Sequence, residues 1–336
     1  MHNVTERDGV FTVRGPAWWD VQGAHDLAEY PTRKQAQQIA HPWEPVAEPV
    51  FRRTVEERFI GSPKVTYTEV ESAVLNTRSD DGFELGVVSK TFTPVTNSQL
   101  YDIAEAIEGL DKGSIMFETG GSLNGGRKVW LLIRLRDPLI VKGDPNGATI
   151  PYYALQNAHD GSASLRGQAL MTRIVCDNTA HFADLEAQAR GTEFTFRHTV
   201  SVNEKIEEAK AALAGWRTSI DHWRRLSEHL IELPVTKEQR TIFIEEFIPM
   251  PMAHTVSDRV VTNVNTARAA LRSILEGETC EGIGLTSYGL VQGSVEYLEH
   301  ARRAQSKESR FKRAYLDRNT IVTDAVDLAQ KVAVSA

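Results

Sequence analysis

The pattern of apolar residues changes abruptly at Ser201, and this change constrains the fold more than any other feature of the sequence. Before Ser201, short β-branched and apolar runs alternate with turn residues, which is typical of antiparallel strands joined by hairpins. After it, apolar residues recur every three or four positions over about eight helical turns, which is the spacing of an amphipathic helix. The sequence therefore predicts an α+β fold, with a mostly antiparallel β-sheet body, flanking helices and an all-helical C-terminal third.

Three consecutive segments are expected. Residues 1–62 are rich in Trp and Pro, which suits an irregular arm that packs through aromatic side chains, with one short helix at 32–39. Residues 63–200 should form a β-rich α+β core. Residues 201–336 should form a helical domain that contains the long amphipathic helix, whose apolar stripe consists of residues 206, 209, 213, 216, 220, 223 and 230.

Two hairpins are predicted in the core. The turn residues Asp80-Asp81-Gly82 separate strand patterns at 64–75 and 83–89. A glycine-rich segment, 120–126, separates strand patterns at 115–119 and 127–135, which predicts a second hairpin with a flexible tip. Further strands are expected at 150–157, 169–176 and 193–198, and further helices at 98–110, 178–189, 257–276, 286–303 and 319–333, with one more from Thr236.

Composition excludes some classes of protein. The net charge of −7 argues against a polycation that coats nucleic acid along its whole surface, although residues 300–318 form a local basic segment with seven Arg or Lys. No apolar run of about 18 residues and no signal-peptide pattern is evident, so we expect a protein of the host-cell cytoplasm with no membrane partner. Cys176 and Cys280 are too few for a disulfide framework, and both are expected to be reduced.

Six segments of the chain carry a pattern that we recognise. They are PAW at 16–18, FETGGSLNGGRKVW at 117–130, NAHDGS at 157–162, TRIVCDNT at 172–179, FRHT at 196–199 and YGLVQGSVEYLEH at 288–300. In order and spacing they resemble the phage/plasmid-like family catalogued as domain of unknown function 932. Departures from the family pattern are Ala158 in place of Ser and Ser287-Tyr288 in place of Trp-Gly. The resemblance implies a gene carried by phages, prophages or plasmids and a cytoplasmic product that works on replicating mobile DNA, but it implies no reaction.

The glycine-rich tip is the first candidate for a nucleic-acid contact. Glycines let a backbone approach a phosphate closely, and the basic residues that follow supply charge, although an ordinary long β-turn is the alternative. The tip glycines are Gly120, Gly121, Gly125 and Gly126. The basic residues expected to contact nucleic acid are Arg127, Lys128, Arg166, Arg173, Arg197, Arg310, Lys312 and Arg313. In the basic segment 300–318, aromatic residues lie among the arginines, as in grooves that bind single-stranded DNA, but a solvated basic helix is the alternative.

Other residues allow different chemistry. His159, Asp160 and His198, with Asp177 as a further ligand, are metal-binding or proton-transfer groups, whereas Asp160 also suits a turn in which it caps backbone N–H groups. For Cys176, a buried thiol is favoured over a nucleophile. The stripe that contains Trp216 and Trp223 is interpreted as core or a subunit seam rather than a base-stacking platform.

These observations leave three hypotheses of function. The first is a phage or mobile-element accessory protein that binds single-stranded DNA as a homo-oligomer, and the narrower form of this hypothesis is an ATP-independent strand-annealing recombination protein. The second is a metal-dependent nuclease or hydrolase. The third is a non-enzymatic phage structural or host-interaction protein that binds its partner through the helical third. The first is preferred, and with it we expect no enzymatic activity and no cofactor.

Overall fold

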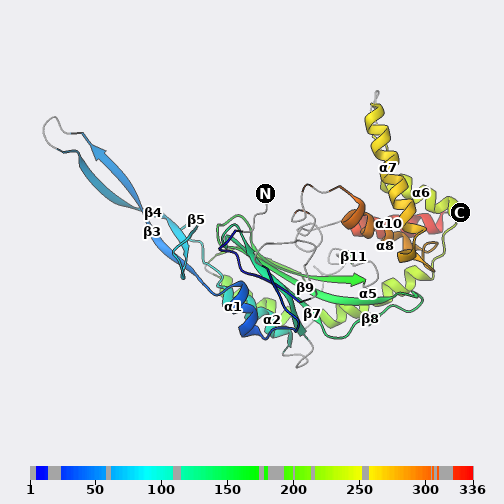
Figure 1. Ribbon diagram of the computed structural model, residues 1–336, viewed down its shortest axis with the longest axis horizontal. Coiled ribbons are helices and arrows are strands. Elements are labelled where there is room, and N and C mark those ends of the chain that lie inside the picture. The colour runs from blue at the N-terminus through cyan, green and yellow to red at the C-terminus, as the bar shows by residue number, and fades with distance from the viewer. Residues whose placement is uncertain are drawn as a thin grey trace. The chain divides into compact units, whose positions relative to one another are not determined.

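The computed structural model of the chain describes residues 5–13, 24–57, 62–108, 115–173, 178–180, 193–199, 201–212, 216–251, 257–303, 305, 309 and 321–335. Helices and largely antiparallel strands are both abundant over these residues, which confirms the predicted α+β fold (Figure 1). After residue 201, the regular elements in the described residues are helices. Among the described residues, no helix has the length and apolar character needed to cross a bilayer.

The larger sheet contains nine strands in the described part of the chain. Their order is β11-β10-β9-β7-β6-β1-β2, with β12 paired to β10 and β8 paired to β9. The strands are β1 (Val10–Thr12), β2 (Ala24–Asp26), β6 (Ile115–Leu123), β7 (Lys128–Leu135), β8 (Leu139–Ile140), β9 (Ala148–Ala158), β10 (Leu165–Arg173), β11 (Asn178–Ala180) and β12 (Phe194–Phe196). The adjacent strands β6, β7, β9 and β10 were predicted from the sequence, and so was β12, which lies within the strand expected at 193–198. β1 pairs antiparallel with β6, and its parallel pairing with β2 is an exception to the antiparallel pattern.

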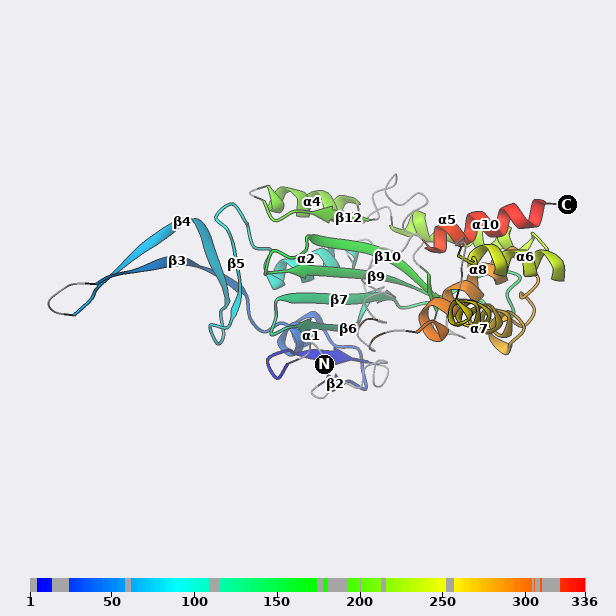
Figure 2. The ribbon, with the colours of Figure 1, turned by 90° about the horizontal axis from the view of Figure 1, so that it is seen from above.

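The smaller sheet consists of β3 (Pro45–Glu56), β4 (Lys64–Arg78) and β5 (Glu84–Ser89), all antiparallel (Figure 2). The hairpin of β4 and β5 was predicted. The irregular arm expected over 1–62 is wrong, because β1, β2 and the twelve-residue strand β3 lie within it. Pro45 and Pro49 are atypical of a strand, and for this reason the sequence did not indicate β3. The structure accommodates them because β3 pairs with β4 alone and an edge strand tolerates proline.

The helices agree with the sequence except at two places. They are α1 (Arg33–Ala40), α2 (Asn97–Glu108), α4 (Val202–Ala212), α5 (Trp216–Ile231), α6 (Lys237–Phe247), α7 (Asp258–Leu275), α8 (Ser287–Glu296) and α10 (Ile321–Val334), with a π-helical segment at Tyr297–Ala301. The predicted long helix is described as α4 and α5, because residues 213–215 lie outside the described residues. The helix expected at 178–189 is wrong at its start, where β11 pairs with β10, and residues 181–192 lie outside the described residues.

Two compact units divide the chain, and they interleave along the sequence instead of following the three consecutive segments that were expected. The first unit comprises residues 1–133, 155–167 and 194–211, and the second comprises residues 134–154, 168–193 and 212–336. Because the larger sheet provides strands to both units, neither corresponds to a single continuous stretch of sequence. The boundaries that the sequence suggested near residues 62 and 200 therefore do not coincide with those of the units.

Buried side chains join helices to strands inside the first unit. α1 begins with a capping box formed by Thr32 and Gln35. It ends at His41, whose buried ring lies between the Tyr101 hydroxyl of α2, at 3.0 Å from Nδ1, and the Gly121 carbonyl of β6, at 2.8 Å from Nε2. Burial lowers the pKa of His41 to about 4, so the ring is neutral at pH 7.

In the second unit, the apolar stripe of α5 is buried within the chain. Trp216, Ile220, Trp223 and Leu230 all lie in the core, and the Trp216 ring packs edge-on against Tyr153 of β9, with the ring centres 5.6 Å apart. This burial agrees with the interpretation of the stripe as core and does not suit a platform open to nucleic-acid bases.

Candidate nucleic-acid interface

Gly120 and Gly121 do not belong to a flexible hairpin tip, and this part of the prediction is wrong. Both lie inside β6, where they pair with Phe11 and Val10 of β1. A Cβ atom at Gly120 would lie 2.9 Å from the Phe11 ring, and one at Gly121 would lie 2.6 Å from the Trp130 ring. These glycines are therefore needed because aromatic rings pack closely on the sheet backbone, not because the backbone approaches a phosphate.

The turn between β6 and β7 is formed by residues 124–127, and its backbone is already occupied. Asn124, Gly125 and Gly126 all have positive φ angles, of 57°, 74° and 99°. The Gly125 amide donates to a carboxylate oxygen of the buried Asp8 at 2.9 Å, and the Gly126 amide donates to the Leu123 carbonyl at 3.2 Å. The tip therefore has the structure of a tight turn, and neither glycine amide is available to cradle a phosphate.

Arg127, the last residue of this turn, has an exposed side chain. Its guanidinium carbon lies 5.8 Å from the centre of the Phe83 ring, and Arg7 lies 4.9 Å from the same ring. Arg7 also forms an ion pair with Asp81 at 3.0 Å. Of these two arginines, Arg7 thus has a carboxylate partner, whereas the contacts described for Arg127 are with a ring and with the Glu84 carbonyl at 3.4 Å.

Strand pairing brings four of the predicted cations to one end of the larger sheet, within the first unit. The His159 amide, at the end of β9, donates to the Arg127 carbonyl at 2.8 Å, so the β9–β10 turn adjoins the start of β7. β12 then runs antiparallel to β10, with Arg166 opposite Thr195. We call Arg127, Lys128, Arg166 and Arg197 the basic end of the sheet. Arg127 and Arg197 are exposed, and Lys128 and Arg166 are half-buried.

Of the other predicted cations, only Arg173 is described by the structure, and it is not part of this group. Arg173 lies at the far end of β10, seven residues beyond Arg166 and in the second unit. Arg310, Lys312 and Arg313 lie outside the described residues, as do most other members of the basic segment 300–318. The structure therefore places four of the five described cations at one end of the larger sheet.

His159 is a core residue, and its environment does not suit the metal-binding or catalytic alternative. The ring is fully buried, lies edge-on to Trp43 with the ring centres 5.3 Å apart, and places Nε2 3.1 Å from the side-chain oxygen of Asn97. Burial lowers the pKa of His159 to about 3. The Asn76 side chain donates to the His159 carbonyl at 2.8 Å, so both the ring and the backbone of this residue hold the fold together.

Asp160 and His198 have structural contacts as well. A carboxylate oxygen of Asp160 accepts the Ser162 amide at 2.9 Å, which confirms the turn interpretation of this segment. The His198 ring stacks on Phe92 at 4.4 Å, and burial is the main reason why its pKa is lowered. Asp177 and Cys176 lie outside the described residues. Among the residues that the structure does describe, no group of three or more His, Cys, Asp or Glu side chains is arranged to hold a metal ion.

Sequence reasoning missed the residue at the centre of this region, Arg78. Its buried guanidinium pairs with Asp80 at 2.6 Å, donates to the Arg7 carbonyl at 2.7 Å and lies 4.6 Å over the Trp43 ring. It also donates to the Gly125 carbonyl at 3.2 Å, which connects the end of β4 to the β6–β7 turn. The only sequence signal was an Arg immediately before the Ser-Asp-Asp-Gly turn. Because an Arg beside a turn is commonly solvent-exposed, this signal did not indicate a buried role.

Comparison with known proteins identifies the family from the same region. Residues 84–319, more than half of the chain, match the family described as Domain of unknown function (DUF932). The chain belongs to this family. No curated protein and no solved structure matches it.

The DUF932 match includes the motifs that contain Gly125, His159 and His198, and it begins at β5. It therefore leaves out β3, β4 and the segment 16–18, which also lies outside the described residues. The motifs around these three residues are turns, close-packed glycines and buried hydrogen bonds in this chain. They lie at the end of the sheet where the basic residues lie.

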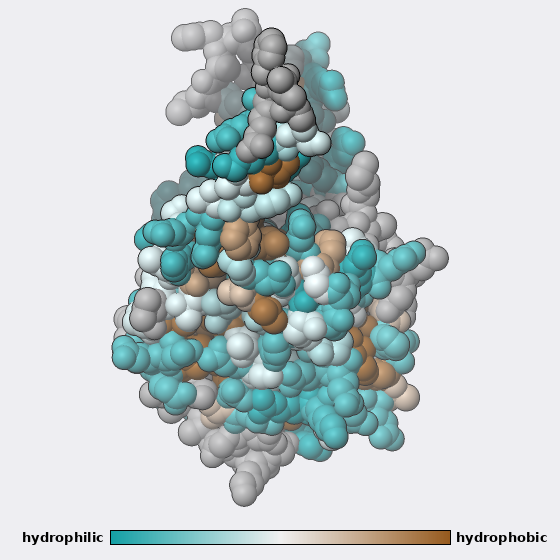
Figure 3. Space-filling view, turned by 90° about the vertical axis from the view of Figure 1, so that its left-hand side faces the viewer, coloured by the Kyte–Doolittle hydropathy of each residue, from teal (hydrophilic) through white to brown (hydrophobic). Residues whose placement is uncertain are grey.

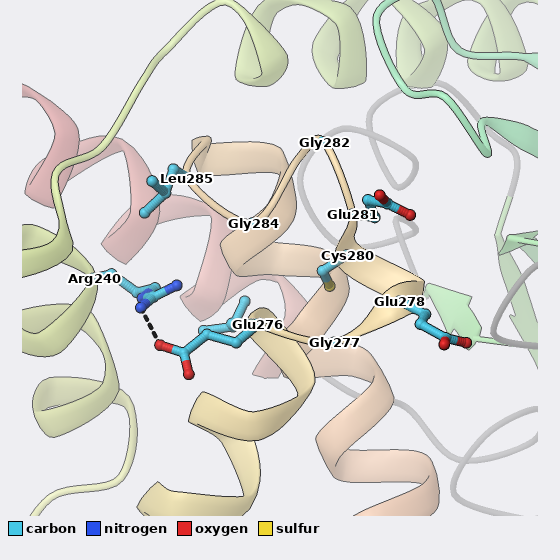
Figure 4. A pocket seen from close by; sticks show the side chains of 10 residues that line it. Arg240, Glu276, Gly277, Glu278, Cys280, Glu281, Gly282, Gly284 and Leu285 are labelled. Carbon is cyan, nitrogen blue, oxygen red and sulfur yellow. Dashed lines mark hydrogen bonds and ion pairs between the residues drawn. The ribbon is translucent and has the colours of Figure 1, made fainter.

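A cavity of about 620 Å³ lies in the second unit between α6 and the loop that follows α7 (Figure 4). Arg240 and Glu276 form an ion pair at its wall, and Glu278 and Glu281 also line it. The Cys280 thiol is buried there and forms no disulfide. Because three carboxylates and one guanidinium line this cavity, it does not suit a phosphate group.

Proposed function

We propose that this DUF932 protein is an accessory protein of a phage or another mobile element, and that it binds single-stranded DNA at the basic end of the sheet. The observation that carries the proposal is the gathering of Arg127, Lys128, Arg166 and Arg197 from three separate segments of the sequence at one end of one sheet. Nonspecific binding of nucleic acid depends mainly on such Arg and Lys contacts to phosphates.

Partly exposed aromatic rings at the same end support a single strand as the ligand. Phe83 lies beneath Arg127, Phe92 stacks on His198, and Phe196 precedes Arg197; all three phenylalanines are half-buried. Proteins that bind single strands combine cations for the phosphates with aromatic faces on which bases stack. Duplex DNA does not expose its base faces in this way.

Strand annealing is the finer form of the proposal. Pairing two complementary strands is downhill once both are held, so the reaction needs no nucleotide, and the sequence contains no GxxxxGK[ST] loop. The hydrolase alternative has less support, because His159 is fully buried and Asp160 caps a turn. An annealing assay with complementary oligonucleotides and no nucleotide tests the finer proposal directly.

The experiment for DNA binding is fluorescence anisotropy of a labelled single-stranded oligonucleotide across a salt series. We expect log K to fall linearly with log salt, with a slope of about −0.7 for each phosphate contacted. The double variant Arg127→Gln/Lys128→Gln should bind several-fold more weakly and with a shallower slope. A matched control is Lys237→Gln/Arg259→Gln, which removes the same charge from exposed positions of the second unit. No binding at low salt, or equal losses in both double variants, would contradict the proposed site.

A further inference from the structure

The paired strands β3 and β4 form a ribbon that has no core of its own. Every described residue at 46–57 and 62–72, which we call the ribbon, is exposed or half-buried. β5 pairs with β4 from Ala73 onward, so the outer part of the ribbon, where residues 51–56 pair with residues 64–69, consists of two strands (Figure 1). A two-stranded hairpin is marginally stable in water unless a third strand, a helix or another surface covers it.

The register of the ribbon separates its side chains into two unlike faces. The cross-strand pairs Phe51–Glu69, Arg53–Tyr67 and Val55–Val65 lie on one face. We call this the apolar face, because it exposes Phe51 by 53%, Tyr67 by 65%, Val55 by 43% and Val65 by 41%. The alternate pairs Arg52–Thr68, Thr54–Thr66 and Glu56–Lys64 lie on the other face and are all polar.

The exposed apolar side chains are concentrated on one face of the ribbon. Four large apolar side chains on one face of a short ribbon form a patch rather than the scattered exposure that is normal for a protein surface. Figure 3, which faces the side of the molecule where the ribbon extends, shows hydrophobic areas among hydrophilic ones. A partner that covers the apolar face would stabilise the ribbon as well as remove this patch from water.

The charges of the ribbon indicate what that partner is. Residues 46–72 carry four Arg or Lys and five Glu, so the ribbon has no excess of positive charge and does not suit nucleic acid or an anionic membrane. On the apolar face itself, one cation and one carboxylate, Arg53 and Glu69, lie beside the apolar groups. A surface with the same apolar groups and the same two opposite charges is complementary to it, and a second copy of this chain has that surface.

We propose that two copies of the chain associate through the apolar faces of their ribbons. In this pair, Arg53 of one copy contacts Glu69 of the other. Because a two-fold axis repeats every contact, Glu69 of the first copy also contacts Arg53 of the second. Phe51 and Tyr67 together offer roughly 200 Å² of exposed area per copy, well below the roughly 800 Å² per partner of a stable interface. The association is therefore reversible and concentration-dependent.

The test combines charge reversal with mixing, read by sedimentation velocity over a range of protein concentrations. The wild-type protein should shift from monomer to dimer as its concentration rises. Arg53→Glu alone places two carboxylates at each contact and Glu69→Arg alone places two cations there, so each variant should remain monomeric. Mixed in equal amounts, the two variants should dimerise, because both contacts then join opposite charges. Arg52→Glu, on the polar face, is the matched control and should dimerise like the wild type.

Each alternative result overturns the proposal. A wild-type protein that stays monomeric at every concentration has no such interface, and reversal variants that still dimerise use another surface. Failure of the mixture to dimerise would show that the two charges act within one chain. A double variant, Phe51→Thr/Tyr67→Thr, that keeps its dimer but loses affinity for a labelled oligonucleotide would assign the apolar face to DNA. Because Arg127 and Lys128 are unchanged in all these variants, the outcome is independent of the proposed basic end of the sheet.

Discussion

The ring of His159 lies edge-on to the indole of Trp43, with the ring centres 5.3 Å apart, in a fully buried position at the end of β9. Trp43 also lies beneath the guanidinium of Arg78, so the histidine, the indole and the arginine form one continuous packed group. This group joins strand β9 to the end of β4 and the start of β3. His159, which the sequence offered as a metal ligand or a general base, is therefore part of the core.

Substitution of His159 should be a stability defect. His159→Ala leaves a cavity beside Trp43 and removes the partner of the buried Asn97 oxygen, so we expect a loss of about 2–4 kcal/mol in the free energy of unfolding. Asp160→Ala, which removes only a capping bond in a turn, should cost about 1 kcal/mol or less. Urea unfolding measures both. Equal, small losses would contradict the core assignment and restore the ligand hypothesis.

Two buried histidines predict how stability depends on pH. Burial lowers the pKa to about 3 for His159 and to about 4 for His41, so both rings are neutral in the folded chain and bind protons more readily when it unfolds. Their contribution to stability is therefore complete above the unfolded pKa of about 6.5 and is lost as pH falls from there toward the folded values. Each histidine should steepen the fall by about 1.4 kcal/mol per pH unit near pH 5.

Urea unfolding at pH 5, 6 and 7 measures this slope. His159→Asn and His41→Asn replace each ring with a neutral group and should each remove about half of the slope attributed to the two histidines, whatever their effect on stability at pH 7. A slope that stays the same in both variants would show that other groups, such as His198 or carboxylates, set the pH dependence.

The sequence predicted the elements that are marked by turn or capping residues a few positions apart. The β4–β5 hairpin follows from the turn at Asp80-Asp81-Gly82, and the helix expected from Thr236 is α6, which Thr236 caps together with Gln239. β3 was missed because its partner β4 lies beyond residue 63 and because Pro45 and Pro49 resemble an irregular segment. The hairpin and α6 were predicted because their signals lie within a few residues, whereas the pairing that defines β3 depends on a distant strand.

The candidate site shows the same division. Exposed cations such as Arg127 could be named from sequence, but their gathering with Arg197 depends on the pairing of β12 with β10. Gly120 was misassigned to a tip because its role depends on Phe11, more than one hundred residues earlier in the chain. The amphipathic ribbon was missed because alternation over 64–72 shows which residues share a face, not whether anything covers that face.

Gly126 and Gly82 form a matched pair that separates backbone strain from close packing. Both have positive φ angles, of 99° and 69°, but a Cβ at Gly126 would lie 2.4 Å from the Trp43 ring, whereas one at Gly82 meets nothing within 4 Å. Gly82→Ala should cost about 1 kcal/mol from the backbone alone. Gly126→Ala should lower the free energy of unfolding by about 1–3 kcal/mol more than Gly82→Ala does, because the buried indole must shift. Thermal unfolding of the two variants checks this order, and equal losses would show that the indole moves freely.

Trp223 tests whether the stripe of α5 belongs to the core of one chain. Its side chain is 2% exposed, and replacement of a buried Trp by Ala costs about 3–5 kcal/mol, a large share of the roughly 5–15 kcal/mol that stabilises a domain. Trp223→Ala should therefore lower the melting temperature by roughly 10 °C or more, by the same amount at every protein concentration. Arg225→Ala, at an exposed position of the same helix, is the control and should change it little.

Two other outcomes of the Trp223 experiment would have different meanings. If the melting temperature of the wild type rises with protein concentration and that of Trp223→Ala does not, the stripe stabilises an assembly, because only a subunit interface links stability to concentration. If Trp223→Ala leaves stability and mass unchanged but weakens oligonucleotide binding, α5 contacts DNA. The burial of Trp216, Ile220 and Leu230 together with Trp223 favours the first result, since a contact surface for either partner would leave at least part of this stripe exposed in the isolated chain.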